Sequence, residues 1–189
     1  MRNQPEEIID YWLNDVGEKG WYMPPDGLDD QIRDRFEDDW NEAMASDVKG
    51  CTVSATGALG LLILLDQFSR NMFRGTAKAY ASDAKALKLA KLAISKGYDT
   101  ETPEPARQFF YMPLEHSESL PDQDQCVRLM AMKMDSPELL KHAKAHREVI
   151  RTFGRFPYRN DHLGRKSTEA EVAYLELGGY RYTLQNLAA

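Results

Sequence analysis

An apolar run from Ala55 to Leu65 passes without interruption into a polar stretch that ends at Arg74. Apolar residues occupy every side of this run when it is drawn as an α-helix, so such a helix must be buried all round. Ser54 or Thr56 can cap its first turn. Because the run is too short to cross a bilayer, other helices of the chain must cover it.

Helical spacing recurs along the rest of the chain, whereas the alternation typical of strands is almost absent. Ile32, Phe36 and Trp40, for example, repeat at i+4. Proline and glycine residues delimit further helices. These are expected near residues 77–96, 121–134, 136–153 and 170–177. We therefore predict an all-α fold of about eight helices joined by short loops and packed as antiparallel hairpins.

The length and composition of the chain fit one globular domain. Its 189 residues are 42% hydrophobic and 29% charged, with no linker, repeat or low-complexity tract. We expect a single all-helical domain spanning residues 1–189. The net charge of −6 argues against nucleic acid or an anionic membrane as the main partner. Oligomeric state is left open.

The two cysteines, Cys51 and Cys126, are far apart in sequence and form no CxxC motif. Buried, reduced thiols are the expectation. The acidic N-terminal residues have neither the basic nor the apolar region of a signal peptide. Together these features predict a cytoplasmic protein.

Polar side chains cluster at the C-terminal end of the apolar helix. Asp66 and Arg70 are spaced i,i+4 and can form an ion pair, which leaves Gln67, Asn71 and Arg74 in need of partners. One interpretation is a buried hydrogen-bond network that fixes helix packing. The other is the floor of a pocket in which Arg70 and Arg74 face an anion.

A second group of arginines lies in the sequence FGRFPYRNDHLGR, where Gly154, Pro157 and Gly164 break the helical pattern. Loops often supply binding groups, and the guanidinium group suits two-pronged contacts with anions. Arg155 and Arg165 are therefore candidate ligands for an anion, as is Arg159. The alternative is charge balance against the acidic residues of the first 50 positions.

The segment PLEHSES supplies candidate acid–base groups. Glu115 and Glu118 are expected on one helix face at i,i+3, with His116 about 100° away. His146 belongs to the apolar stripe of its helix and points toward the core. It can be a hydrogen-bonded residue of the core, or it can act as a general acid or base.

Motifs that would imply a metal or a cofactor are weak or missing. His142 and His146 have the i,i+4 spacing of zinc ligands, with Glu138 on the same face. No HExxH motif or facing Glu-x-x-His pair accompanies them, so we predict no metal site. GxSxG, GxxxxGK[ST] and GxGxxG are all absent. The sequence requires no cofactor.

Three long segments resemble the signature blocks of a bacterial family, domain-of-unknown-function family 924. They read LLILLDQFSRNMFRGTAKAYASDAKAL, FFYMPLEHSES and HREVIRTFGRFPYRNDHLGRKSTEAEVAYL. The resemblance extends over nearly the whole chain. It implies an all-helical, tetratricopeptide-like superhelical fold and no particular biochemical role.

The positions that match the family's motifs include the candidate residues above. They are Asp66, Gln67, Arg70, Asn71, Arg74, Glu115, His116, His146, Arg155, Arg159, Asn160 and Arg165. Two positions depart from the family pattern. Ser69 stands where the family usually has proline, which leaves the bend of this helix open. Tyr158 stands where it usually has histidine, which weakens a mechanism that needs a second imidazole in this loop.

We weigh two main hypotheses for function. In the first, the protein is a helical binding or scaffold protein whose Arg-rich polar pocket holds a small anion or an acidic peptide. This requires residues 66–74 and 153–165 to converge. In the second, it is an enzyme that acts on an anionic small molecule, with Glu115, His116 or His146 as the acid–base group. A scaffold that uses an open groove is a variant of the first hypothesis.

Overall fold

The computed structural model describes residues 3–47 and 54–187, so Cys51 lies outside the described residues. Every regular element in these ranges is helical and none is a β-strand, which confirms the predicted all-α class. The chain divides into two compact units, Met1–Pro113 and Leu114–Ala189. A single domain over residues 1–189 stays a prediction.

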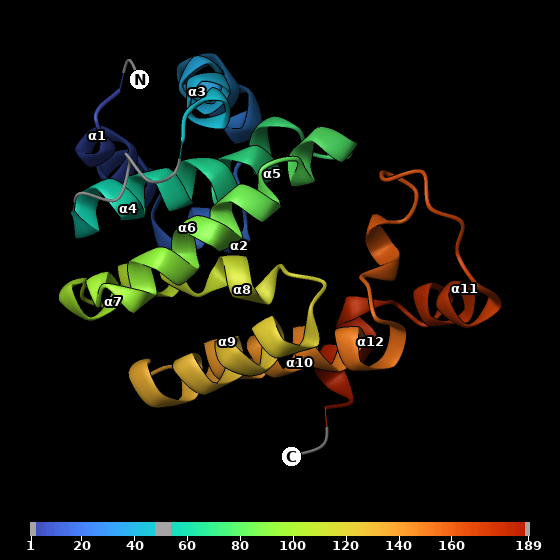
Figure 1. The fold of residues 1–189 in the computed structure, drawn as a ribbon. Helices are drawn as coiled ribbons and strands as arrows, with labels where there is room; N and C mark the ends of the chain where they lie inside the picture. Colours follow the sequence, from blue (N-terminus) through green and yellow to red (C-terminus); the bar gives the residue numbers. More distant parts are fainter. Residues whose placement is uncertain (1–2, 48–53, 188–189) are drawn as a thin grey trace. The chain divides into compact units, whose positions relative to one another are not determined.

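The first unit consists of α-helices with π and 3₁₀ segments between them (Figure 1). In chain order these are α1 (Pro5–Asp10), η1 (Tyr11–Val16), α2 (Gly17–Tyr22), α3 (Leu28–Ala45), α4 (Ala55–Leu62), η3 (Ile63–Phe68), α5 (Ser69–Met72), η4 (Ala77–Tyr80), α6 (Asp83–Ser95), α7 (Tyr98–Glu101) and η5 (Ala106–Phe110). The helix expected at 77–96 is therefore split into η4 and α6.

The apolar run forms α4 and the start of η3, and it is buried as predicted. Ser54, and not Thr56, caps the helix, because its Oγ accepts a hydrogen bond from the Gly57 backbone N–H at 3.0 Å. Helices α1 and α6 pack on α4, while α3 packs on η3 and α5 (Figure 1). A Cβ at Gly60 would lie 2.9 Å from the Pro5 Cα atom, so glycine permits the close approach of α1.

The helix geometry changes from α to π near the point where the sequence becomes polar. In the π segment η3, hydrogen bonds run from i to i+5, so its side chains depart from the faces expected at 3.6 residues per turn. Ser69, in the position of the family's usual proline, is buried, and its Oγ donates to the Leu65 carbonyl oxygen at 2.8 Å. The helical run nevertheless continues from Ala55 to Met72.

The second unit follows the short helix α8 (Met112–Glu115), which spans the point in the sequence where the units are divided. Its elements are α9 (Leu120–Lys133), α10 (Pro137–Phe153), η6 (Pro157–Arg159), α11 (Glu169–Glu176) and α12 (Tyr180–Gln185). The short connection 134–136 joins α9 and α10 as an antiparallel hairpin, which confirms the expected packing for this pair.

A small apolar core lies beside this hairpin. Val149 and Ile150 of α10 pack there with Phe156 and with Tyr174 of α11. Helix α12 also packs against α10. Within residues 3–47 and 54–187, no helix has both the length and the apolar character needed to cross a bilayer. The tetratricopeptide-like superhelix stays a prediction.

Candidate functional site

The candidate residues fall into two groups, one in each unit. Asp66, Gln67, Arg70, Asn71 and Arg74 lie in η3, α5 and the turn after α5. Glu115, His116, His146, Arg155, Arg159, Asn160 and Arg165 lie in the second unit. The expected meeting of the two arginine groups stays a prediction.

In the first unit, Asp66 and Arg70 form the predicted ion pair, with 3.4 Å between Arg70 Nη1 and Asp66 Oδ1. Gln67 Nε2 donates to the other Asp66 oxygen at 2.6 Å. Arg70 also holds Asp83 of α6 in a two-pronged contact at 2.9 and 3.1 Å. The buried Asp66 carboxylate thus has charged and polar neighbours on both oxygens.

The remaining polar side chains at this end of the helix bind Asp29 of α3. Asn71 Nδ2 donates to Asp29 at 2.8 Å, and Arg74 donates through Nε and Nη2 at 2.6 and 3.0 Å. The hydrogen bond from Arg74 is the main reason that the pKa of Asp29 is lowered. We call Asp29, Asp66, Gln67, Arg70, Asn71, Arg74 and Asp83 the α5 polar cluster. Its contacts are those of the hydrogen-bond network that the sequence suggested.

In the second unit, Glu115 and His146 form a close pair. Glu115 Oε1 lies 2.8 Å from His146 Nδ1, and their side chains are 7% and 13% exposed. His146 Nδ1 also lies 3.0 Å from the His142 carbonyl oxygen, one turn earlier in α10. We call Glu115 and His146 the carboxylate–imidazole pair.

The partners of Nδ1 define the tautomer of His146. A backbone carbonyl and a carboxylate both accept hydrogen bonds, so Nδ1 must carry the proton that they share. In the neutral ring, Nε2 is then the nitrogen with the lone pair. Across the part of the chain that the structure describes, Nε2 has no hydrogen-bond partner.

The charge of Glu115 is stabilised by imidazoles. Burial alone would raise the pKa of Glu115, yet this pKa is lowered because His146, and then His116 and His142, favour the carboxylate. Its second oxygen lies 4.0 Å from Cys126 Sγ. Burial, and next the charge of Glu115, raise the pKa of Cys126, which keeps a thiol beside the carboxylate.

Aromatic rings surround the His146 imidazole. Ring centroids lie at 4.5 Å for Tyr180, 5.7 Å for Phe156 and 6.2 Å for His116. The Tyr180 hydroxyl lies 2.7 Å from His142 Nδ1. Burial, followed by the charge of Glu115, raises the pKa of Tyr180, so its hydroxyl stays protonated. Rings of this kind limit the access of water to the imidazole.

The i,i+4 spacing of Glu138 and His142 produces an ion pair, with 3.3 Å from Glu138 Oε1 to His142 Nε2. His146 lies one turn further along α10, but its Nδ1 is directed to Glu115. Among the described residues, no three His, Cys, Asp or Glu side chains are arranged to hold a metal ion.

Glu115 and Glu118 do not share a helix face, contrary to the sequence expectation. Helix α8 ends at Glu115, and the chain turns before α9 begins at Leu120. Glu118 instead binds Arg165 in a two-pronged contact at 2.6 and 2.9 Å and accepts the Phe156 backbone N–H at 2.9 Å. Burial would raise the pKa of Glu118, but the Arg165 hydrogen bond and the Phe156 N–H lower it.

The other arginines of the loop also have contacts within the second unit. Arg155 binds the buried Glu171 at 2.6 and 2.8 Å, and this hydrogen bonding lowers the pKa of Glu171 to about 2. The Arg159 guanidinium stacks over the Phe156 ring at 4.4 Å. Asn160 Nδ2 donates to Ser167 Oγ at 3.0 Å. The Arg155–Glu171 contact fixes the loop to α11, and the Asn160–Ser167 contact fixes it to the segment before α11.

Several residues of these sites were not identified from the sequence. Asp29 and Asp83 supply the partners of the α5 polar cluster, and Glu171 supplies that of Arg155. Tyr180 packs on His146 from a helix far along the chain. The capping-box pattern of Thr168 and Glu171 was the one local signal available for any of them.

The fold and the site together define an all-helical protein with a buried carboxylate that orients an imidazole. Over residues 8–179 the chain matches the family described as bacterial protein of unknown function (DUF924), and it belongs to this family. It is similar to a solved structure, the protein of unknown function ATU0120 from Agrobacterium tumefaciens. The two are 38% identical, the match covers 91% of this chain and 96% of that chain, and the TM-score is 0.85. None of the curated proteins compared with the chain matches it.

Proposed function

We propose that the second unit carries a general acid–base site in which His146 exchanges a proton with an anionic small molecule. The observation that carries the proposal is the 2.8 Å contact between Glu115 Oε1 and His146 Nδ1. It fixes the proton on Nδ1 and directs the lone pair of Nε2 away from the carboxylate. A carboxylate that orients a histidine in this way is a recurrent arrangement for proton transfer.

The surroundings of the imidazole support this role. Phe156 and Tyr180 flank the ring and reduce its contact with water. Arg159 lies on the Phe156 ring and adds positive charge to this part of the unit. That charge favours an anionic substrate, and His116 is a second imidazole close to His146. Chemistry on small anionic metabolites also fits the cytoplasmic location expected from the sequence.

The Arg-rich polar pocket has less support. Arg70, Arg74, Arg155 and Arg165 each hold a carboxylate through two hydrogen bonds. To bind an anion in the same manner, a guanidinium group would have to release its present partner. The Arg-rich pocket, with the convergence that it requires, is retained as a prediction of lower priority.

The test compares the purified protein with the variant His146→Asn. Each is incubated with phosphorylated sugars, nucleotides and di- and tricarboxylates near neutral pH, and products are measured by mass spectrometry. We expect the wild-type chain to convert at least one anionic compound and the variant to do so about 10²–10⁴-fold more slowly, the usual contribution of a general acid or base.

His162→Asn is the matched control, because His162 is an exposed histidine outside the carboxylate–imidazole pair. We expect this variant to keep the wild-type rate. Circular dichroism checks that all three proteins are folded. Identical product profiles for the wild-type protein and His146→Asn would show that His146 transfers no proton to these compounds, and the proposal would be abandoned.

A further inference from the structure

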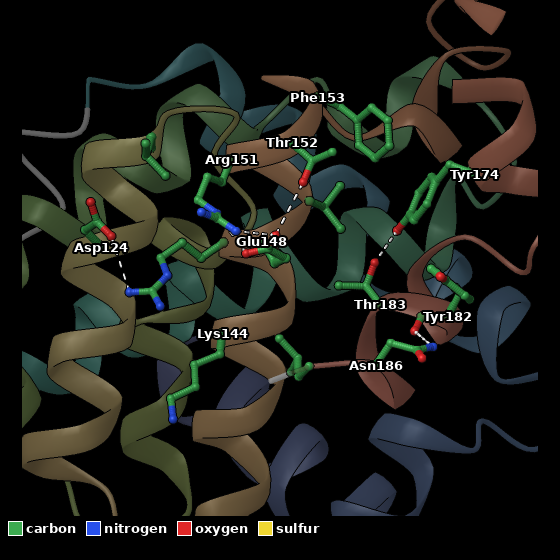
Figure 2. A pocket seen from close by; sticks show the side chains of 14 residues that line it. Asp124, Lys144, Glu148, Arg151, Thr152, Phe153, Tyr174, Tyr182, Thr183 and Asn186 are labelled. Atoms are coloured by element: carbon green, nitrogen blue, oxygen red, sulfur yellow. Dashed lines mark hydrogen bonds and ion pairs between the residues drawn. The ribbon is translucent and has the colours of Figure 1, made fainter. Parts of the chain in front are cut away.

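A groove of about 910 Å³ lies in the second unit (Figure 2). It is lined by the beginning of α9, by α10 and by the α11–α12 hairpin. Neither Glu115 nor His146 lines it, so it is separate from the carboxylate–imidazole pair. Its volume lies within the range of about 300–1,000 Å³ that is usual for ligand-binding pockets.

One wall of the groove carries cations from α10. Lys144, Arg147 and Arg151 follow one another at spacings of three and four residues, which places them on one side of the helix. Figure 2 shows Lys144 and Arg151 among the side chains that line the groove. Their shared face gives the groove a row of positive charges.

Two of these three cations, Lys144 and Arg147, are only weakly neutralised. Lys144 is exposed and forms no ion pair with any residue that the structure describes. Arg147 is 3.4 Å from Asp124, a long contact between exposed groups. Arg151 is already paired, because it holds Glu148 through two hydrogen bonds at 2.9 and 2.8 Å. Lys144 and Arg147 can therefore accept further negative charge at little cost.

The facing wall is aromatic and polar. Tyr174 and Thr183 are joined by a 2.9 Å hydrogen bond between their hydroxyl groups, which ties α11 to α12. Tyr182 is exposed, and Phe153 at the end of α10 completes an apolar surface. Figure 2 shows Tyr174, Tyr182 and Thr183 on the hairpin. Rigid aromatic side chains next to positive charge suit a peptide with both acidic and apolar residues.

We propose that this groove binds an acidic peptide segment of another protein, a segment that carries one large apolar side chain. Its carboxylates would lie along Lys144 and Arg147, and its apolar side chain would pack against Phe153 and Tyr182. This inference does not depend on the acid–base site. A nucleic acid fits less well, because the protein has a net charge of −6 and a long polyanion would meet more of its surface than a short peptide does.

The probe is a fluorescein-labelled peptide of sequence EDEAFEDE, and binding is followed by fluorescence anisotropy. We expect saturable binding to the wild-type chain and none of the basic counterpart KRKAFKRK. Lys144→Glu should weaken binding about tenfold, because it reverses a charge inside the groove. Lys141→Glu is the matched control: Lys141 is exposed on the same helix but does not line the groove. It should change the affinity by less than about twofold.

A second variant tests the shape of the groove without a change of charge. Thr152 is exposed within the groove, so Thr152→Trp should fill part of it and weaken probe binding while circular dichroism stays unchanged. Absence of saturable binding to the wild-type chain would overturn the proposal. So would equal losses in Lys144→Glu and Lys141→Glu, or displacement of the probe by a single-stranded oligonucleotide at lower concentration than by unlabelled peptide.

Discussion

The α5 polar cluster and the carboxylate–imidazole pair both place charge against an apolar core, but they differ in how many of their hydrogen-bonding groups have partners. In the cluster, Arg70 and Arg74 each hold a carboxylate with two hydrogen bonds. In the pair, Glu115 occupies only one nitrogen of His146. Both arginines of the cluster are thus bound to carboxylates, whereas Nε2 of His146 has no hydrogen-bond partner among the described residues.

The chemistry of the guanidinium and imidazole groups accounts for this difference. A guanidinium group is always protonated and only donates hydrogen bonds. An imidazole can gain or lose a proton near neutral pH and can accept as well as donate. Under the proposed function, an imidazole that is held on one side and open on the other is a better candidate for proton transfer than a guanidinium group bound to a carboxylate through two hydrogen bonds.

The largest effect on stability is expected from Glu115→Ala. The change removes a buried carboxylate from His146 and Cys126, and losing a buried hydrogen bond to a charged group costs about 1.5–3 kcal/mol. Urea unfolding at pH 7 measures the loss. Glu115→Gln is the matched variant, because its amide oxygen can still accept from Nδ1, and it should cost less. A loss below about 1 kcal/mol in the alanine variant would mean that the pair is not a structural unit.

Asp83→Ala should have a smaller effect, although Asp83 also holds a cation with both oxygens. Arg70 keeps Asp66, both through the carboxylate at 3.4 Å and through the backbone carbonyl at 2.8 Å. We therefore expect a loss of about 1–2 kcal/mol in urea unfolding. A loss equal to that of Glu115→Ala would show that the contacts between Arg70 and Asp66 do not compensate for the loss of Asp83.

The sequence predicted those parts of the fold that local pattern controls. The apolar run had to be buried wherever its neighbours lay. Ser54 was one of two candidate caps, and its side chain accepts the backbone N–H of Gly57, three residues further on. The α9–α10 hairpin followed from the short connection between two periodic segments. The π segment η3 was not predicted, because it depends on packing around the polar end of the helix.

The candidate sites show the same division between local and tertiary contacts. Asp66 and Arg70 are four residues apart in the sequence, and their ion pair was predicted from this spacing alone. Glu115 and His146 were both named as candidates, but their contact joins α8 to α10 and no spacing encodes it. The groove was missed for the same reason, since its walls come from separate helices. A sequence names residues with suitable chemistry, and the tertiary fold decides which of them meet.

The smallest effect is expected at the exposed edge of the α5 polar cluster. Arg74 is 56% exposed, so the Arg74→Ala variant should lose less than about 1 kcal/mol at pH 7. The pKa of Asp29 is lowered, mainly by the Arg74 hydrogen bond, so this contribution is complete above the ordinary value of 3.8 and is lost as the pH falls through the folded-state value. The difference between the wild-type protein and the variant in urea unfolding should therefore shrink from pH 7 toward pH 3. A difference that stays constant over this range would show that Arg74 stabilises the protein through packing of its alkyl chain and not through its charge.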